Sequence, residues 1–440
     1  MSFDSATNFA GLWDSLLPIG RDGSTGGYRR YSWTPEDQQC RAWFTSAAAE
    51  RGLRTHCDRN GNLWAWWDSP DSSPGPASAA DAAGGSRPSG LGVSPVSTVL
   101  PRAGAIVTGS HLDSVPDGGA FDGPLGVVSA FAAIDLLRER GVVPARPVAV
   151  AAFCEEEGAR FGVACLGSRL LTRAITPEAA RGLRDGGGVT LADAMAAAGH
   201  DPGGIGPDDE LLASIGAYVE LHVEQGRALA DLDSAIGIAE GIWPHGRWRL
   251  DFTGQADHAG TAALADRHDP MLPYAAAALA ARQAAAANGT LATFGKVVAE
   301  PGGANAVCST VTAWLDARAP QETALRSTVD EVLAAAERAA GLHGVTVAVR
   351  PESITPPVTF DLGLRETVAA SLAARGITAP VLPTAAGHDA GVLSARLPAA
   401  MLFVRNPSGV SHAPAEHADA ADCAAGVEAL AAVLHDLASR

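Results

Sequence analysis

Residues 105–123 read AIVTGSHLDSVPDGGAFDG, and residues 147–158 read PVAVAAFCEEEG. Each stretch begins with an apolar run of strand length and ends in ionisable residues set among or before glycines. Phe121 to Arg140 has a helical pattern, so the three segments predict a strand, a helix and a second strand of a parallel, buried sheet. Sites in open α/β sheets form at the carboxyl ends of such strands. We therefore expect the two ionisable groups to share one site.

The first ionisable group contains His111, Asp113, Asp117 and Asp122. Imidazole and carboxylate side chains are common metal ligands, and the glycines between them provide a flexible backbone that lets them converge. The His-x-Asp spacing further indicates that Asp113 orients the ring of His111 or sets its tautomer. Taken alone, this group fits a polar turn as well as it fits a metal site.

The second group is the glutamate triplet Glu155, Glu156 and Glu157, directly after an apolar strand. Three adjacent like charges are costly where burial is expected, unless cations compensate for them. A lone triplet of this kind is usually a solvated loop. Its position beside the first group favours a metal site instead.

Two more histidines lie in polar turns after apolar segments: His222 in ELHVEQG (220–226) and His412 in GVSHAPAEHAD (409–419). One such histidine is more often structural. Two of them, together with the first two groups, make a two-metal site plausible. The expected ligands are His111, Asp122, one glutamate of the triplet, His222 and His412.

The chain predicts two domains. Residues 244–357 follow the order strand, helix, two strands, helix, strand, which is the ferredoxin-like split. We therefore expect an inserted domain there, with residues 1–243 and 358–440 forming the other domain. Ser69 to Arg102 is rich in Ser, Pro, Gly and Ala, which predicts a mobile low-complexity insertion.

Composition excludes several classes of function. The 440 residues carry a net charge of −17 without a Lys/Arg cluster, so binding to nucleic acid is not expected. The six cysteines form no CxxC pair, which is typical of reduced thiols in the cytoplasm. No secretory signal or apolar run of membrane-spanning length is present, so we expect a cytoplasmic protein with no membrane partner.

Seven motifs in combination resemble the M20 metallopeptidase superfamily, and within it the hydantoinase/carbamoylase branch. This branch contains N-carbamoyl-L-amino acid hydrolases, β-ureidopropionases and allantoate amidohydrolases. The motifs are GSHLDSVPDGGAFDG, EEEGARF, ELHVEQG, DHAGT, GGANAV, GHDAG and SHAPAE. The resemblance covers nearly the whole chain outside residues 69–102. It implies an α/β fold with a zinc-peptidase-like mixed sheet flanked by helices, and an inserted ferredoxin-like lid or dimerisation domain.

The resemblance also implies roles at a centre of two divalent ions, which could be Zn, Mn, Co or Ni. Asp122 would bridge the ions, His111 and His412 would bind one on each side, and His222 and a glutamate would complete the set. In this family the metal-binding glutamate directly precedes the glycine and the general base comes just before it. This assigns Glu157 as ligand and Glu156 as base, with Glu155 as the competing base if the register slips by one.

Residues of the inserted domain would bind substrate, often across a dimer interface. By resemblance, His258 and Asn305 would stabilise an oxyanion and Arg318 would hold a carboxylate. Gln225, Arg247 and His388 are further candidates for the pocket.

The implied activity is hydrolysis of the ureido amide bond of an N-carbamoyl-L-amino acid by a homodimer. The alternatives are an allantoate or other ureide amidohydrolase and, less favoured, an N-acyl amino acid or dipeptide hydrolase. Residues 262–264 read AAL where Pro and Met are usual after the preceding Thr, which leaves the exact substrate open. A catalytically silent binding protein would have lost ligands, whereas all five ligands and the base are present.

Overall fold

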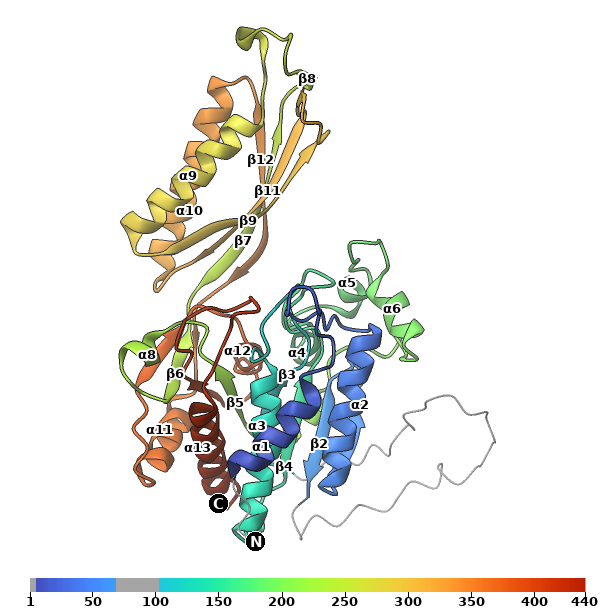
Figure 1. Ribbon diagram of the computed structural model, residues 1–440, viewed down its shortest axis with the longest axis vertical. Coiled ribbons are helices and arrows are strands. Elements are labelled where there is room, and N and C mark those ends of the chain that lie inside the picture. Colours follow the sequence, from blue (N-terminus) through green and yellow to red (C-terminus); the bar gives the residue numbers. More distant parts are fainter. Residues whose placement is uncertain (1–4, 69–102, 440) are drawn as a thin grey trace. The chain divides into compact units, whose positions relative to one another are not determined.

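A computed structural model describes residues 5–68 and 103–439 (Figure 1). The insertion expected at residues 69–102 lies outside the described residues. The chain divides into two compact units. The first comprises Met1–Glu240, Phe360–Leu382 and Gly387–Arg440, and the second comprises Gly241–Thr359 and Pro383–Ala386.

The first unit is built on a mixed sheet in which neighbouring strands follow the order β1-β2-β4-β3-β5-β15-β6-β13, and the last of these, β13 (Val358–Thr359), is antiparallel to β6. The central strands β4, β3, β5 and β15 are parallel, and β1, β2 and β6 are antiparallel to their neighbours. This arrangement confirms the predicted α/β class. The strands are β1 (Arg54–Cys57), β2 (Leu63–Trp67), β3 (Ala105–His111), β4 (Val148–Phe153), β5 (Ile215–Val223), β6 (Ile236–Ile242), β14 (Val381–Thr384), which pairs with β6, and β15 (Ala399–Val404).

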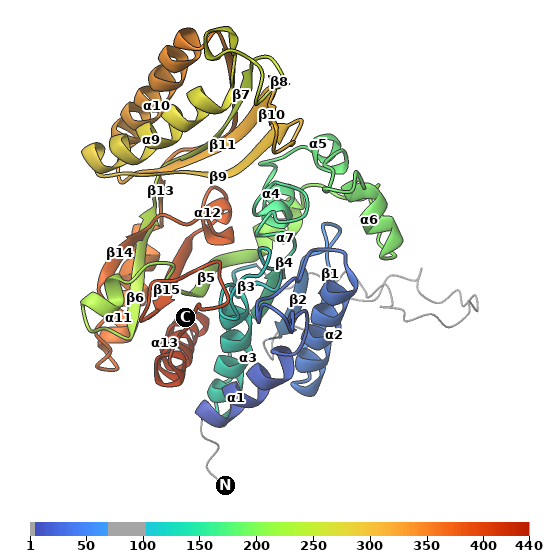
Figure 2. The same cartoon turned by 45° about the horizontal axis from the view of Figure 1, so that its top comes forward.

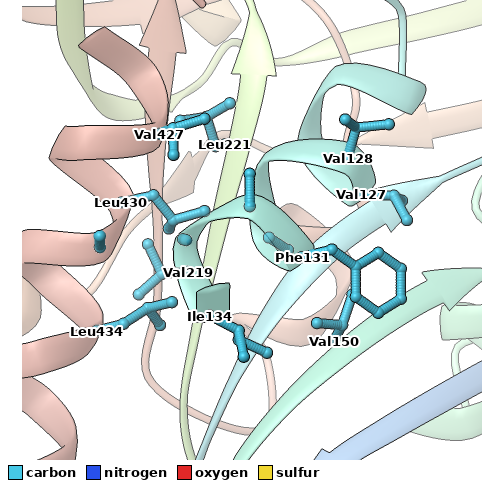
Figure 3. Close-up of a cluster of buried hydrophobic side chains, with 14 of the residues drawn as sticks. Val127, Val128, Phe131, Ile134, Val150, Val219, Leu221, Val427, Leu430 and Leu434 are labelled. Atoms are coloured by element: carbon cyan, nitrogen blue, oxygen red, sulfur yellow. The ribbon is translucent and has the colours of Figure 1, made fainter. Parts of the chain in front are cut away.

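Helices flank this sheet and bury its apolar side chains. Helices α3 (Pro124–Glu139) and α13 (Ala420–Ala438) pack against each other and against the strands, and Figure 3 shows the resulting core. Each fully buried aliphatic or aromatic side chain there contributes about 2 kcal/mol. The labelled, fully buried residues are Val127, Val128, Phe131, Ile134, Val150, Val219, Leu221, Val427, Leu430 and Leu434. The other helices of the unit are α1 (Ser5–Leu16), α2 (Pro35–Glu50), α4 (Leu166–Thr172), α5 (Pro177–Arg181), α6 (Leu191–Ala197), α7 (Asp209–Ser214), α8 (Ala228–Asp231), α11 (Leu362–Ala373) and α12 (Asp389–Leu393).

The start of α3 fixes one of the predicted ligands. Gly123, with φ of 83°, caps the helix, and Pro124 opens its first turn. A Cβ at Gly123 would lie 2.4 Å from the ring of His111, so only glycine fits beside that histidine. Because α3 is packed in the core, Asp122 has a fixed position just before the amino end of this helix.

The second unit is a four-stranded antiparallel sheet in the order β12-β7-β11-β9. Helices α9 and α10 lie side by side along it (Figure 2), which confirms the ferredoxin-like arrangement. Alternate residues of β11 are buried, so one face of the sheet is apolar and the other is polar. The elements are β7 (His245–Thr253), β8 (Asp257–His258), η2 (Leu264–Asp266), α9 (Met271–Asn288), β9 (Leu291–Glu300), β10 (Ala306–Val307), β11 (Thr310–Arg318), α10 (Glu322–Leu342), β12 (Thr346–Thr355) and β13 (Val358–Thr359).

The boundaries of the second unit differ from the predicted 244 and 357. The unit begins at Gly241 and also includes Pro383–Ala386, which the sequence assigns to the other domain. Two hydrogen bonds explain the difference: Trp243 N donates to Thr384 O at 2.8 Å, and Arg318 Nη1 donates to Ala385 O at 2.9 Å. A four-residue segment of this kind has no sequence pattern of its own.

Within residues 5–68 and 103–439, no helix combines the length and the apolar character needed to cross a bilayer.

Candidate metal centre

The predicted ligands converge at the carboxyl ends of the parallel strands of the first unit. His111 is the last residue of β3, His222 is the penultimate residue of β5, and the glutamate triplet follows β4 by one residue. His412 lies in the loop between β15 and α13. The sheet register explains the convergence, because His111 pairs with Phe153 of β4 and Phe403 of β15 pairs with His222.

Asp122 is shared by two groups of potential ligands. One group is His111, Asp122 and His222, and the other is Asp122, Glu157 and His412; within each, one ligand atom per residue lies within 4.8 Å of the others. Asp122 Oδ1 is 3.2 Å from His222 Nε2 and 3.5 Å from His111 Nε2. Asp122 Oδ2 is 3.3 Å from His412 Nε2. Each carboxylate oxygen therefore faces a different group, as a carboxylate bridging two ions would.

The two buried histidines present the correct nitrogen for metal binding. Nδ1 of His222 lies 2.8 Å from Val223 O, and Nδ1 of His111 lies 3.1 Å from Asp113 O. Donation of each Nδ1 proton to a carbonyl leaves Nε2 as the metal-binding atom. Among the described residues, His222 Nε2 is buried and meets no hydrogen-bond partner of suitable geometry. Such a buried atom beside carboxylate oxygens is costly unless a cation satisfies it, so these residues fit a metal.

The three glutamates point in different directions. Glu155 has a left-handed φ of 55°, and its Oε1 accepts hydrogen bonds from the N–H groups of Arg160 and Phe161 at 3.1 and 2.8 Å. Glu156 Oε2 instead lies 3.6 Å from His111 Nε2, and Glu157 Oε2 lies 3.6 Å from His412 Nε2. The latter two side chains therefore face the cluster, whereas that of Glu155 turns to its own loop.

Asp113 holds this loop in place. Its Oδ1 and Oδ2 accept hydrogen bonds from the backbone N–H groups of Glu156 and Glu157 at 3.2 and 3.1 Å. Its carboxylate lies 3.5 Å from His111 Nδ1, farther than its own carbonyl oxygen. The carbonyl oxygen of Asp113 thus orients the ring of His111, and the carboxylate of Asp113 holds the backbone of Glu156 and Glu157.

Burial and mutual charge shift the pKa values of the cluster. Burial raises the pKa of Asp122, but the neighbouring imidazoles of His111, His222 and His412 outweigh burial and hold it well below the usual range. Burial lowers the pKa of His222, whereas Asp122 more than compensates and raises it to about 9. Burial, followed by the charge of Asp122, raises the pKa of Glu157 well above its usual range. Metal ligands must be deprotonated, so cation binding here is coupled to proton release.

Two side chains support Asp122 from outside the ligand groups. Gln225 Nε2, a predicted pocket residue, donates to Asp122 Oδ2 at 2.6 Å. Glu416 Oε1 accepts hydrogen bonds from the N–H groups of Phe121 and Asp122 at 3.1 and 2.9 Å. Sequence reasoning gave no role to Glu416, although the SHAPAE motif contained it.

A further buried group lies behind His222. Glu220, His222 and His388 each place a potential ligand atom within 4.8 Å of the others, and the rings of His222 and His388 are 4.5 Å apart. Glu220 accepts hydrogen bonds from Ser110 Oγ at 2.7 Å and from Ala390 N at 3.0 Å. The predicted pocket residue His388 thus lies against the predicted ligand His222. Glu220 of β5 connects this strand to α12 through Ala390, a role that the sequence did not predict.

The predicted residues of the second unit fall into two groups. His258 pairs with Ala306 in the β8–β10 ladder, and Ala259 N donates to Asn305 O at 3.0 Å, so His258 and Asn305 are neighbours with exposed side chains. Arg318 Nε donates to Asp316 Oδ1 at 2.8 Å, and Arg247 Nη2 lies 3.8 Å from Asp316 Oδ2.

These groups lie at opposite ends of the same sheet. Arg318 pairs with His245 at one end of the β7–β11 ladder, whereas Thr310 pairs with Thr253 at the end from which β8 and β10 continue. The nine residues of β11 span roughly 26 Å at about 3.3 Å per residue. Within one chain, the structure therefore brings His258 to Asn305 but not to Arg318.

Comparison with known proteins agrees with this geometry. The model of peptidase family M20/M25/M40 matches residues 107–436. The N-carbamoyl-L-amino acid amidohydrolase of Geobacillus stearothermophilus is 34% identical over 95% of this chain and 96% of its own length. The allantoate amidohydrolase of Bacillus subtilis (strain 168) is 32% identical over 76% of this chain and 81% of its own length.

The fold also has solved counterparts. The crystal structure of an amidase of the hydantoinase/carbamoylase family from Burkholderia vietnamiensis matches with a TM-score of 0.85 and 26% identity, over 100% of both chains. Family, relatives and fold lead to one conclusion: the chain belongs to peptidase family M20/M25/M40, in its hydantoinase/carbamoylase branch, and is a hydrolase that acts on amide bonds.

Proposed function

We propose that the protein is a binuclear metal-dependent amidohydrolase that cleaves the ureido bond of an N-carbamoyl-L-amino acid. The observation that carries the proposal is Asp122, whose two oxygens face two different ligand groups. His111 and His222 would hold one ion with Asp122, and Glu157 and His412 would hold the other. The proposed substrate class follows the relative from Geobacillus stearothermophilus.

Glu156 is the proposed general base. Two divalent ions held by these groups would lower the pKa of a bound water molecule towards neutrality. Glu156 is buried and faces His111, so it can take a proton from this water and return it to the departing nitrogen. The products from a carbamoyl amino acid would be the amino acid, ammonia and carbon dioxide.

Arg318, with Arg247 beside it, is proposed to hold the substrate carboxylate, and His258 with Asn305 to stabilise the oxyanion. The two groups lie roughly 26 Å apart along β11, which is longer than a carbamoyl amino acid. One substrate would therefore need these groups from two chains, which supports a homodimer. The proposed compartment is the cytoplasm, where the cysteine thiols stay reduced.

The second candidate is hydrolysis of allantoate or another ureide, which the relative from Bacillus subtilis supports. Turnover of N-carbamoyl amino acids and of allantoate by the purified protein, measured as ammonia release, separates the two. Cleavage of N-acyl amino acids or dipeptides, without either of these reactions, would reject both.

Two variants test the mechanism and the pairing of chains. Glu156→Gln should lower kcat by on the order of 10³-fold while metal analysis still finds two ions per chain. Arg318→Ala and His258→Ala should each be weakly active alone, and mixed subunits should regain activity because one site of the mixed dimer is intact. Full activity of Glu156→Gln, or no gain on mixing, would contradict the respective part of the proposal.

A further inference from the structure

The start of helix α4 is attached to the glutamate triplet. Three consecutive backbone N–H groups donate to the carbonyl groups of the triplet and of the residue before it. These bonds are Cys165 N to Glu156 O at 2.6 Å, Leu166 N to Glu155 O at 3.0 Å, and Gly167 N to Cys154 O at 2.9 Å. Residues 165–167 and 154–156 are thus held in fixed register.

This register brings the thiol of Cys165 to Glu156. Cys165 Sγ lies 3.1 Å from Glu156 Oε1, and both side chains are buried. Burial, followed by the charge of Glu156, raises the pKa of the Cys165 thiol well above its usual range, so it stays protonated and donates. One oxygen of Glu156 is held by the thiol, while the other faces His111 Nε2 at 3.6 Å.

The backbone of Cys165 is strained, and hydrogen bonds of Ser168 hold it in place. Its φ of 55° is left-handed, a conformation that costs a residue with a Cβ about 1–2 kcal/mol. Ser168 Oγ lies 3.1 Å from Cys165 O and 2.5 Å from Asp389 Oδ1, which connects this turn to α12. Strain that surrounding contacts maintain is a feature of functional sites.

We propose that Cys165 is a positioning residue that fixes the carboxylate of Glu156. This inference rests on the proposed function, in which Glu156 is the base. The thiol restrains Oε1, so that Oε2 stays directed at the cluster and proton transfer occurs without reorientation of the side chain. The contact acts on the chemical step, so its loss lowers kcat and leaves KM and metal content unchanged.

The test compares Cys165→Ala with Cys165→Ser, which keeps a donor. A thiol is a weak donor to a charged acceptor, so Cys165→Ala should lower kcat about three- to tenfold, and Cys165→Ser should stay within about twofold of the parent. Cys423→Ala removes a buried cysteine of α13 that does not contact Glu156 and should leave kcat unchanged. If Cys165→Ala does not fold, Cys165→Gly, which also lacks a donor and adopts the left-handed backbone without strain, replaces it.

The outcomes separate this inference from the proposed function. Equal kcat for the parent and for Cys165→Ala, or equal losses in the Ala and Ser variants, overturns the positioning role. A change in KM or metal content that accounts for the loss also overturns it. Glu156→Gln, assayed in parallel, tests the base itself: if that variant stays active, the proposed mechanism fails whatever the cysteine variants do.

Discussion

Two ion pairs of identical spacing, one from each unit, differ in their exposure to water. Asp37 and Arg41 in α2 are four residues apart and 2.8 Å from each other, with side chains only 9% and 10% exposed. Glu322 and Arg326 in α10 have the same spacing and a distance of 3.0 Å, but their side chains are 59% and 72% exposed. Water screens the second pair, whereas the first pair has lost its hydration and depends on its partner groups.

The metal centre and the polar face of the second unit differ in the same way, in the exposure of their charged side chains to water. Asp122 and the histidines around it are mostly buried, so removal of one charge leaves the others uncompensated. Arg318 and Asp316 each keep 31% of their side chains exposed. We therefore expect large effects in the buried set and moderate or small effects in the exposed set.

The largest effect is expected for Asp122→Asn. The amide keeps the size of the side chain but loses the charge and one acceptor oxygen. Activity should fall by at least about 10³-fold, more than the 10- to 100-fold typical of losing an outer partner of a ligand. Metal analysis should find fewer than two ions per chain.

Asp117→Asn is the matched control for this change. Asp117 lies in the same loop, but its partly exposed carboxylate pairs with Arg29 at 3.0 Å and accepts a hydrogen bond from Thr25 Oγ1. Activity within about twofold of the parent is expected. Equal losses in both variants would mean that the loop, and not the shared carboxylate, matters.

Asp37→Ala comes next, with a loss of about 3–5 kcal/mol in the free energy of unfolding, because Arg41 remains buried without its partner. The backbone N–H of Trp33 also loses its acceptor, which lies at 2.8 Å. Urea denaturation followed by tryptophan fluorescence measures the loss. A value below about 1 kcal/mol would remove the distinction between the two ion pairs.

Arg318→Ala should raise KM about 10- to 100-fold, because a charge-assisted hydrogen bond contributes about 1.5–3 kcal/mol. Arg350 is the control, since it is exposed, pairs with Asp251 at 3.1 Å and has no proposed contact with substrate. Steady-state kinetics of Arg318→Ala and Arg350→Ala should differ in KM. Similar values of KM would show that Arg318 does not bind the carboxylate.

The smallest effect is expected for Glu322→Ala, within about 0.5 kcal/mol in the free energy of unfolding. Addition of 1 M salt should reduce even this difference, since an exposed pair is screened. Urea denaturation at low and high salt measures both values. A loss above about 2 kcal/mol would mean that exposure does not predict the strength of an ion pair in this protein.

The sequence predicted the features that depend on local pattern. Apolar runs bounded by glycine became β3 and β4, and the rule that parallel strands end at one edge brought His111 and the glutamates together. The order of strands and helices in residues 244–357 is also a local pattern, and it predicted the ferredoxin-like sheet.

Other features depend on contacts that no local pattern encodes. Glu416 and Phe121 are 295 residues apart, and their hydrogen bond requires the finished loop after β15. The turn of the Glu155 side chain into its own loop depends on its left-handed backbone, and the contact of Cys165 with Glu156 depends on the register of α4. The resemblance favoured Glu156 and Glu157 and kept Glu155 as a competing base, but no local pattern indicated that the carboxylate of Glu155 is bonded within its own loop.

The alternation of buried and partly exposed residues along β11 limits which sequence changes the second unit can accept. Thr310, Thr312, Trp314, Asp316 and Arg318 share the polar face, and the residues between them are buried. Insertion of one residue would move Arg318 to the buried face, and insertion of two would shift it by about 7 Å. A sequence change that keeps Arg318 in place must therefore keep the strand length. Other changes are confined to replacement of side chains and to connecting segments such as residues 259–270.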